Sequence, residues 1–166
     1  MFSLKEILPF YPAPQRIFRE FILREYLQYK ILQIVFDMRG QADKLCFLGG
    51  TALRIIHGNQ RFSEHIDFDN TGLTEEEFYD ISECIKKKLE QEGYEIEMRT
   101  VMRNAFHCYI KFPALLFKEG LTGHHSEKIL SNWTRSLNIM ILRLPNTSSI
   151  NLMCLLKFRL LHSIFC

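Results

Sequence analysis

The stretch Leu48-Gly49-Gly50-Thr51-Ala52-Leu53-Arg54, followed by Arg61-Phe62-Ser63-Glu64-His65-Ile66-Asp67-Phe68-Asp69, decides the fold of this chain. The apolar run from Leu45 to Leu48 ends in two glycines, which predicts a buried strand that leads into a tight turn. A helix from Thr51 to about Ile56 is expected to start at that turn. His65 to Asp69 alternates polar and apolar residues, and this period predicts a second strand.

The segments around this unit predict further helices and a pair of strands. Apolar residues recur at helical spacing from Gln15 to about Met38. Thr74 and Glu77 form a capping box for a helix through about Glu92. Tyr94 to Arg103 and Phe106 to Phe112 alternate as paired strands would. The order of these elements predicts an α/β (α+β) domain with a small mixed sheet flanked by helices.

Composition limits the class of protein. The chain has 166 residues, 47% of them apolar, which suits one domain with one core. A net charge of +2 is too small to indicate nucleic-acid binding by itself. Five cysteines without a C-x-x-C pair suggest reduced thiols, and no leader or membrane-spanning run is visible. We therefore expect a cytoplasmic protein without a membrane partner.

The spacing of glycines and carboxylates indicates a phosphate and metal site. Two carboxylates that are separated by one residue on a strand project from the same face, where they can hold one or two Mg²⁺ ions. A Gly-Gly turn at a helix start exposes backbone N–H groups to phosphate, and Thr51 or Arg54 would add a hydroxyl or a cation. Each feature alone is common in ordinary turns and edge strands. Together, in this order, they indicate nucleotidyl or phosphoryl transfer.

These residues resemble the AbiEii/AbiGii-type nucleotidyltransferases, toxins of bacterial toxin–antitoxin and phage-abortive systems in the polymerase-beta-like superfamily. The likeness extends from about Leu4 to Leu130, through Tyr26–Leu32 and Glu127–Leu130. It implies a nucleotidyltransferase fold that transfers a nucleotide from an NTP, with Mg²⁺, to an acceptor. For some members that acceptor is the 3′ end of tRNA, and a cognate antitoxin is an implied partner.

The resemblance also implies roles for particular residues. Gly49, Gly50, Thr51 and Arg54 would bind the nucleotide, whereas Asp67 would be catalytic and ligate the metal. His65 stands where the family pattern has the first metal-binding Asp. Imidazole is a poor ligand for Mg²⁺, although it suits Zn²⁺ or Mn²⁺. We therefore expect impaired catalysis in this chain.

Two nearby carboxylates are candidates to replace the missing one. Asp69 lies two residues beyond Asp67, so an ideal strand places both side chains on the same face. Glu64 is expected to project from the opposite face. Asp69 is thus a further candidate metal ligand.

A second departure follows Leu130, where the family pattern continues into a strand with a third carboxylate. Residues 131–166 contain no Asp or Glu. In a shifted reading frame, each codon takes the last base of one present codon and the first two bases of the next. In this frame the codons for Asn132-Trp133-Thr134 encode Leu-Asp, whichever synonymous codons the gene uses. This predicts a nucleotidyltransferase-like domain at 1–130 and an out-of-frame tail at 131–166, with the native C-terminal region truncated. The alternative is an ordinary hydrophobic strand and helix, Leu137–Leu144 and Ile150–Phe165.

Three functional interpretations stay open on the sequence. The first is an active nucleotidyltransferase, with His65 as a metal ligand and another carboxylate in place of the third. The second is a non-catalytic module that binds nucleotide or antitoxin. The third is a pseudogene product without function. Lys111, on a strand that faces the site, is a further candidate for phosphate contact, whereas Lys86-Lys87-Lys88 reads as a solvated helix face.

Overall fold

The protein, for which we analysed a computed structural model, has a five-stranded mixed sheet in the order β1-β2-β5-β4-β3. The structure describes residues 2–103, 105–123 and 136–143. The strands are β1 (Leu45–Leu48), β2 (His65–Asn70), β3 (Glu97–Arg103), β4 (Ala105–Lys111) and β5 (Ser136–Arg143). The helices are α1 (Leu4–Ile7), α2 (Arg19–Asp37), α3 (Arg39–Ala42), α4 (Gly49–His57), α5 (Glu75–Gln91) and α6 (Leu115–Lys118), with short 3-10 turns at Leu8–Phe10 and Ala13–Gln15.

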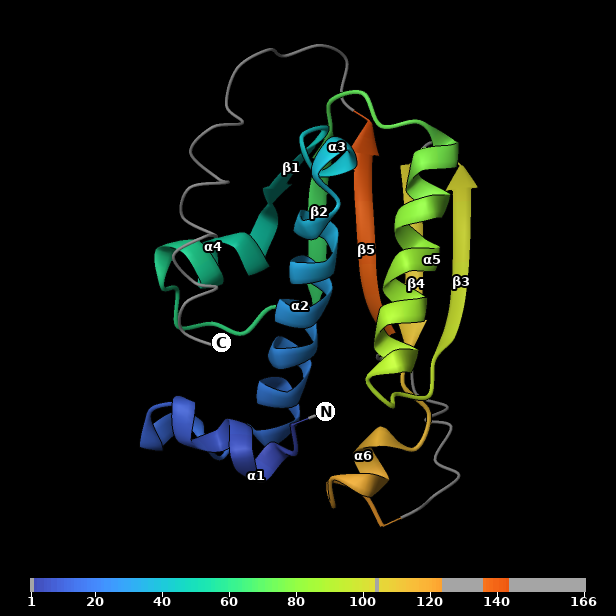
Figure 1. The fold of residues 1–166 in the computed structure, drawn as a ribbon. Coiled ribbons are helices and arrows are strands. Elements are labelled where there is room, and N and C mark those ends of the chain that lie inside the picture. Colours follow the sequence, from blue (N-terminus) through green and yellow to red (C-terminus); the bar gives the residue numbers. More distant parts are fainter. Residues whose placement is uncertain (1, 104, 124–135, 144–166) are drawn as a thin grey trace.

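The expected mixed sheet is confirmed. β1 and β2 pair antiparallel, as do β3 with β4 and β4 with β5, whereas β2 and β5 run parallel. Helices α2 and α5 lie on one face of this sheet, and α4 lies beside β1 and β2 (Figure 1). The unit β1–α4–β2, which contains the glycine turn, therefore forms one edge of the sheet.

The core lies between the sheet and the two long helices. In β2, Ile66 and Phe68 are fully buried, whereas the alternate residues His65, Asp67 and Asp69 are partly or fully exposed. The aromatic ring of Phe106 stacks on that of Phe78 from α5 at 5.2 Å between centroids. Burial of apolar side chains from strand and helix removes them from water and stabilises this face. The opposite face of β2 is left for polar residues.

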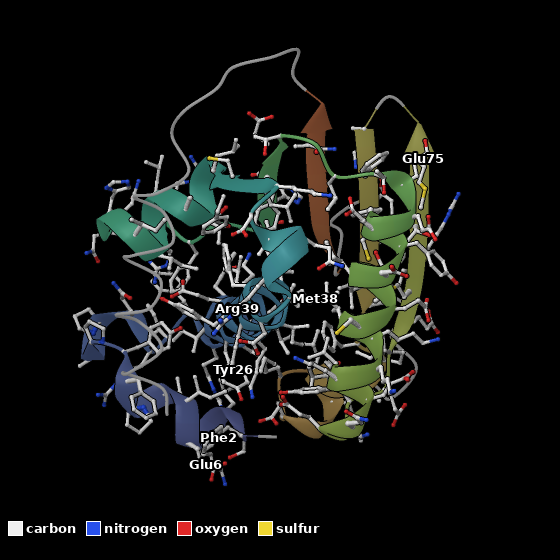
Figure 2. All side chains as sticks on the ribbon, turned by 45° about the horizontal axis from the view of Figure 1, so that its top comes forward. Phe2, Glu6, Tyr26, Met38, Arg39 and Glu75 are labelled. Atoms are coloured by element: carbon white, nitrogen blue, oxygen red, sulfur yellow. The ribbon has the colours of Figure 1, made fainter. Side chains whose placement is uncertain are left out.

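The first long helix differs in detail from the prediction. A helix is expected from Gln15 to Met38, but α2 begins at Arg19, after a 3-10 turn that contains Pro14. Met38 has a non-helical backbone, with φ −85° and ψ 70°, so α2 ends at Asp37. A one-turn helix, α3, then begins at Arg39, where the sequence pattern predicts the end of the helical region. Figure 2 labels Met38 and Arg39 at this junction.

The second long helix follows the predicted local signals. The Thr74 hydroxyl accepts a hydrogen bond from the Glu77 N–H at 3.2 Å, and the Glu77 carboxylate accepts one from the Thr74 N–H at 2.9 Å. This capping box satisfies two backbone donors at the start of α5. Gly93, with φ +91°, follows the helix end. The next strand starts at Glu97, three residues later than expected. The Tyr94 N–H donates a hydrogen bond to the Leu89 carbonyl oxygen at the end of α5, and Tyr94 is buried against Phe112.

Only part of the C-terminal segment is described. Residues Ser136–Arg143 form β5, the central strand of the sheet, at the place where the alternative interpretation put a strand at Leu137–Leu144. The helix expected at Ile150–Phe165 and the residues Asn132–Thr134 lie outside the described residues. The division of the chain at residue 130 and the frameshift stay predictions. Among the described helices, none has the length and apolar character that a membrane crossing requires.

Candidate functional site

The close approach of Gly49 to Asp67 is the central feature of the site. In the β1–β2 ladder Leu48 lies opposite Asp67, so the chain turns into α4 directly beside that carboxylate. Gly49 has φ +81°, and a Cβ built on it would lie 3.0 Å from Cγ of Asp67 and overlap its Oδ2. Both the backbone angle and the lack of space therefore require glycine at this position.

The next two residues fix the start of α4 on β2. A Cβ at Gly50 would lie 2.9 Å from Oγ of Ser63, so this glycine also permits a close approach. The buried Thr51 hydroxyl donates a hydrogen bond to the carbonyl oxygen of His65. The hydroxyl of Thr51 thus holds the helix start against the strand. A contact between Thr51 and a nucleotide stays a prediction.

The two carboxylates of β2 lie on the same face of the strand, as expected. Burial raises the pKa of Asp67 above its ordinary value, and the positive charge of His65 opposes this shift. The Oδ1 atom of Asp69 is buried and has no hydrogen-bond partner among the described residues. A buried carboxylate oxygen without a donor is unfavourable unless a cation or water satisfies it. The pair therefore offers oxygen ligands to a cation.

The other two candidate ligands are placed differently. His65 is exposed at the first position of β2. Glu64 forms an ion pair with Arg24 of α2, with 3.0 Å between its Oε2 and the Arg24 nitrogen. This confirms that Glu64 turns away from Asp67, toward the helix side. Among the described residues no three His, Cys, Asp or Glu side chains cluster closely enough to hold a metal ion by themselves.

Asp67 and Asp69 nevertheless fit a divalent cation that takes its remaining ligands from a substrate. Mg²⁺ is commonly held by one or two carboxylates together with phosphate oxygens and waters. The unpartnered oxygen of Asp69 and the cradle at Gly49 both favour such a ligand. Asp67 and Asp69 would hold the cation, and the N–H groups at the start of α4 would face the phosphates.

Arg54 lies away from the glycine turn, in the last turn of α4. Its guanidinium forms a buried ion pair with Glu25 of α2 and stacks over the Phe62 ring, 3.8 Å from the centroid. It also donates hydrogen bonds to the carbonyl oxygens of Asn59 and Gln60 at 3.1 and 2.8 Å. In this structure Arg54 therefore fixes α4 and the following loop on α2. Its predicted contact with nucleotide is not tested by this arrangement.

Sequence analysis missed two residues of this region. Glu25 accepts hydrogen bonds from Tyr11 and Arg54 and is only 5% exposed. A charged residue inside the apolar stripe of α2 was the available signal, because buried carboxylates require partners. Ser63 gave no comparable signal, since its proximity to Gly50 arises from tertiary packing.

The neighbouring strand supplies no carboxylate to the site. β5 pairs with the whole length of β2, and position 140 of β5 lies opposite Asp67. The sequence of β5, SLNIMILR, contains neither Asp nor Glu. In the described part of the chain, the carboxylates of the site come from β2.

Comparison with known proteins gives one match. A family model described as "Nucleotidyl transferase AbiEii toxin, Type IV TA system" matches residues 30–127, more than half of the chain. The match includes β1, the glycine turn, α4 and β2. Neither the curated proteins nor the solved structures gave a match.

Proposed function

The chain belongs to the AbiEii nucleotidyltransferase toxin family, and from this premise we propose that its β1–α4–β2 unit binds a nucleoside triphosphate with a divalent cation. The family places it among the nucleotidyltransferase toxins of toxin–antitoxin systems. One observation carries the proposal: Gly49 packs closely on Asp67, so the backbone proposed to bind phosphate lies beside the carboxylate proposed to bind the metal. We further propose that nucleotide transfer by this chain is strongly impaired.

The proposed binding follows from the geometry of the turn. The N–H groups of the first turn of α4, which have no partner within the helix, would attract the phosphates together with the helix dipole. Asp67 and Asp69 hold the cation through carboxylate oxygens. Mg²⁺, when bound, supplies the charge neutralisation that a triphosphate needs during nucleotidyl transfer. Burial raises the pKa of Asp67 because it disfavours the ionised carboxylate, and a cation bound beside Asp67 would offset this effect.

The proposed impairment follows from missing negative charge. By the resemblance, His65 stands where the family pattern has the first carboxylate, and the sequence of β5 offers no carboxylate beside Asp67. A cation held by fewer carboxylates binds more weakly and is positioned less firmly for transfer. Imidazole suits Zn²⁺ and Mn²⁺ better than Mg²⁺, so residual activity is expected to be higher with Mn²⁺.

The proposed substrates follow from family membership. An NTP would donate the nucleotide, the 3′ end of an RNA such as tRNA would accept it, and a cognate antitoxin would control the protein. The alternative function is a non-catalytic module that binds nucleotide or antitoxin. Tight NTP binding without any incorporation, even after repair of the site, would favour this alternative.

Incorporation of labelled nucleotide tests the proposal. Radiolabelled NTPs, total tRNA and Mg²⁺ or Mn²⁺ are incubated with the chain and with three repaired versions. These carry His65→Asp, a corrected reading frame after Leu130, or both. We expect strong incorporation only with both repairs, because each restores one carboxylate. A soluble, folded double repair that transfers nothing to any acceptor would contradict the catalytic assignment.

A further inference from the structure

The face of the sheet that carries the carboxylates also carries a pair of stacked rings. His107 and Tyr109 of β4 lie with their ring centroids 6.0 Å apart and their planes inclined by only 17°. Both side chains are partly exposed, whereas their neighbours Phe106, Cys108 and Ile110 are buried toward the helices. Because α2 and α5 lie on the other face of the sheet (Figure 1), the rings lie on its polar face.

Strand register places this ring pair in the same rows as the candidate site. Position 140 of β5 lies opposite Asp67 on one side and opposite His107 on the other. In the same way, position 138 of β5 lies opposite His65 on one side and opposite Tyr109 on the other. Two strand spacings amount to about 10 Å, so the rings lie about that far from the carboxylates, on the same face of the sheet.

Two cations flank the rings on this face. Arg99 of β3 lies opposite Tyr109 in the register, and Lys111 is the next residue of β4 on the same face. Both side chains are exposed, and neither forms an ion pair with any described residue. Glu97 lies opposite Lys111 without forming an ion pair with it. Beside its aromatic rings, the face thus carries two cations and one carboxylate that form no ion pair among the described residues.

We propose that Arg99, His107, Tyr109 and Lys111 form an acceptor platform that binds the unpaired 3′ end of an RNA. A base would extend the stack formed by His107 and Tyr109, and the two cations would contact the flanking phosphates. Stacking on protein rings requires unpaired bases, so the platform selects single strands over duplexes. The proposal rests on the proposed function, because it assigns the acceptor for the same site.

Binding of RNA without nucleotide transfer tests the platform. Fluorescence anisotropy is measured with a labelled 12-nucleotide single-stranded RNA, the matching duplex and a single-stranded DNA of equal sequence. We expect Tyr109→Ala to weaken RNA binding about 5- to 100-fold, the range for loss of one stacked base. Tyr109→Phe keeps the ring and should bind as the parent chain does. Equal thermal unfolding of both variants shows that the sheet is intact.

A second pair of variants tests the role of charge. Arg99→Gln should weaken RNA binding and reduce its dependence on salt concentration, because one phosphate contact is lost. Lys87→Gln is the matched control, since Lys87 is exposed on α5 at the other face of the sheet. It should leave RNA binding unchanged.

Several outcomes would overturn the platform. These are unchanged RNA affinity in Tyr109→Ala, tighter binding of the duplex or of DNA, and equal losses in Arg99→Gln and Lys87→Gln. Titration of NTP and Mg²⁺ on the same samples separates the two proposals. If the chain binds NTP but not RNA, the platform alone is overturned. If the chain binds RNA but not NTP, the proposed function is contradicted.

Discussion

At the scale of single residues, the site depends on the lack of a side chain at position 49. The left-handed backbone of Gly49 and its contact with Asp67 are separate reasons to exclude every other residue. Sequence reasoning identified this glycine as necessary for phosphate approach. It could not foresee that the group pressed against it would be Asp67, because that contact depends on the strand register.

Gly49→Ala should destabilise the protein by about 1–3 kcal/mol, through positive φ and overlap with Asp67, and should abolish nucleotide binding. Gly58→Ala is a matched control, because Gly58 has φ +71° but no atom within 4 Å of the point that its Cβ would occupy. The control should lose about 1–2 kcal/mol from backbone strain alone and keep nucleotide binding. Denaturant unfolding and NTP titration of both variants check this. Equal nucleotide binding by both would show that the space at Gly49 is unimportant.

At the scale of elements, local signals predicted more than tertiary ones. The capping box at Thr74 and Glu77 placed the start of α5 correctly, because its hydrogen bonds join residues three apart. The break at Met38 and the delayed start of β3 were not predicted. The buried contact between Glu25 and Arg54 was not predicted either, because it joins residues 29 positions apart in the sequence.

The buried ion pair should hold α4 on α2. Glu25→Leu or Arg54→Met alone is expected to destabilise the protein by about 3–5 kcal/mol, because each leaves a buried charge without its partner. The double variant Glu25→Leu, Arg54→Met should lose less than the sum of the single losses. Urea unfolding of the four proteins measures the coupling. Additive losses would show that the pair does not join the two helices energetically.

The start of α5 should show a defined dependence on pH. The hydrogen bond from Lys44, followed by that from the Thr74 N–H, lowers the pKa of Glu77 below its ordinary value of 4.5. A lowered carboxyl pKa contributes stability above pH 4.5, and this contribution is lost as pH falls through the folded-state pKa. Glu77→Gln should therefore be less stable than the parent chain at pH 7, and the difference should shrink below pH 4.5.

Thermal unfolding at a series of pH values from about 3 to about 7 measures this difference, because glutamate carboxyl groups titrate within that range. Glu76→Gln is the control, because Glu76 is exposed in the same helical turn and its side chain makes no hydrogen bond within the described residues. A stability difference between Glu77→Gln and the parent chain that is independent of pH would contradict the assigned cause.

At the scale of the whole molecule, the family match covers residues 30–127 and the mixed sheet agrees with the expected fold, whereas a departure of the C-terminal segment from the family stays a prediction. The fold class and the β1–α4–β2 unit could be predicted from the sequence, because periodicity and the glycine turn are local. The central position of β5 could not, since an apolar strand carries no information about its neighbours. Its lack of carboxylates fits the proposed loss of transfer.

The frameshift hypothesis is tested on the gene rather than on the protein. Sequencing through the codons for Lys128 to Trp133 and onward past the stop should reveal one base gained or lost. The corrected frame should encode Leu-Asp at the codons of Asn132–Thr134, followed by a longer chain. A confirmed present frame would mean that this protein lacks the third carboxylate, and a binding module or a pseudogene product would then be the better description.

The most direct test of the central claim is calorimetric titration of the full chain with each ribonucleoside triphosphate, in the presence and absence of Mg²⁺. The account predicts saturable binding that requires Mg²⁺ and is weakened about tenfold or more in Asp67→Asn, a loss of at least about 1.4 kcal/mol. Absence of binding by the folded parent chain, or equal binding by the parent and Asp67→Asn, would contradict a nucleotide site between Gly49 and Asp67.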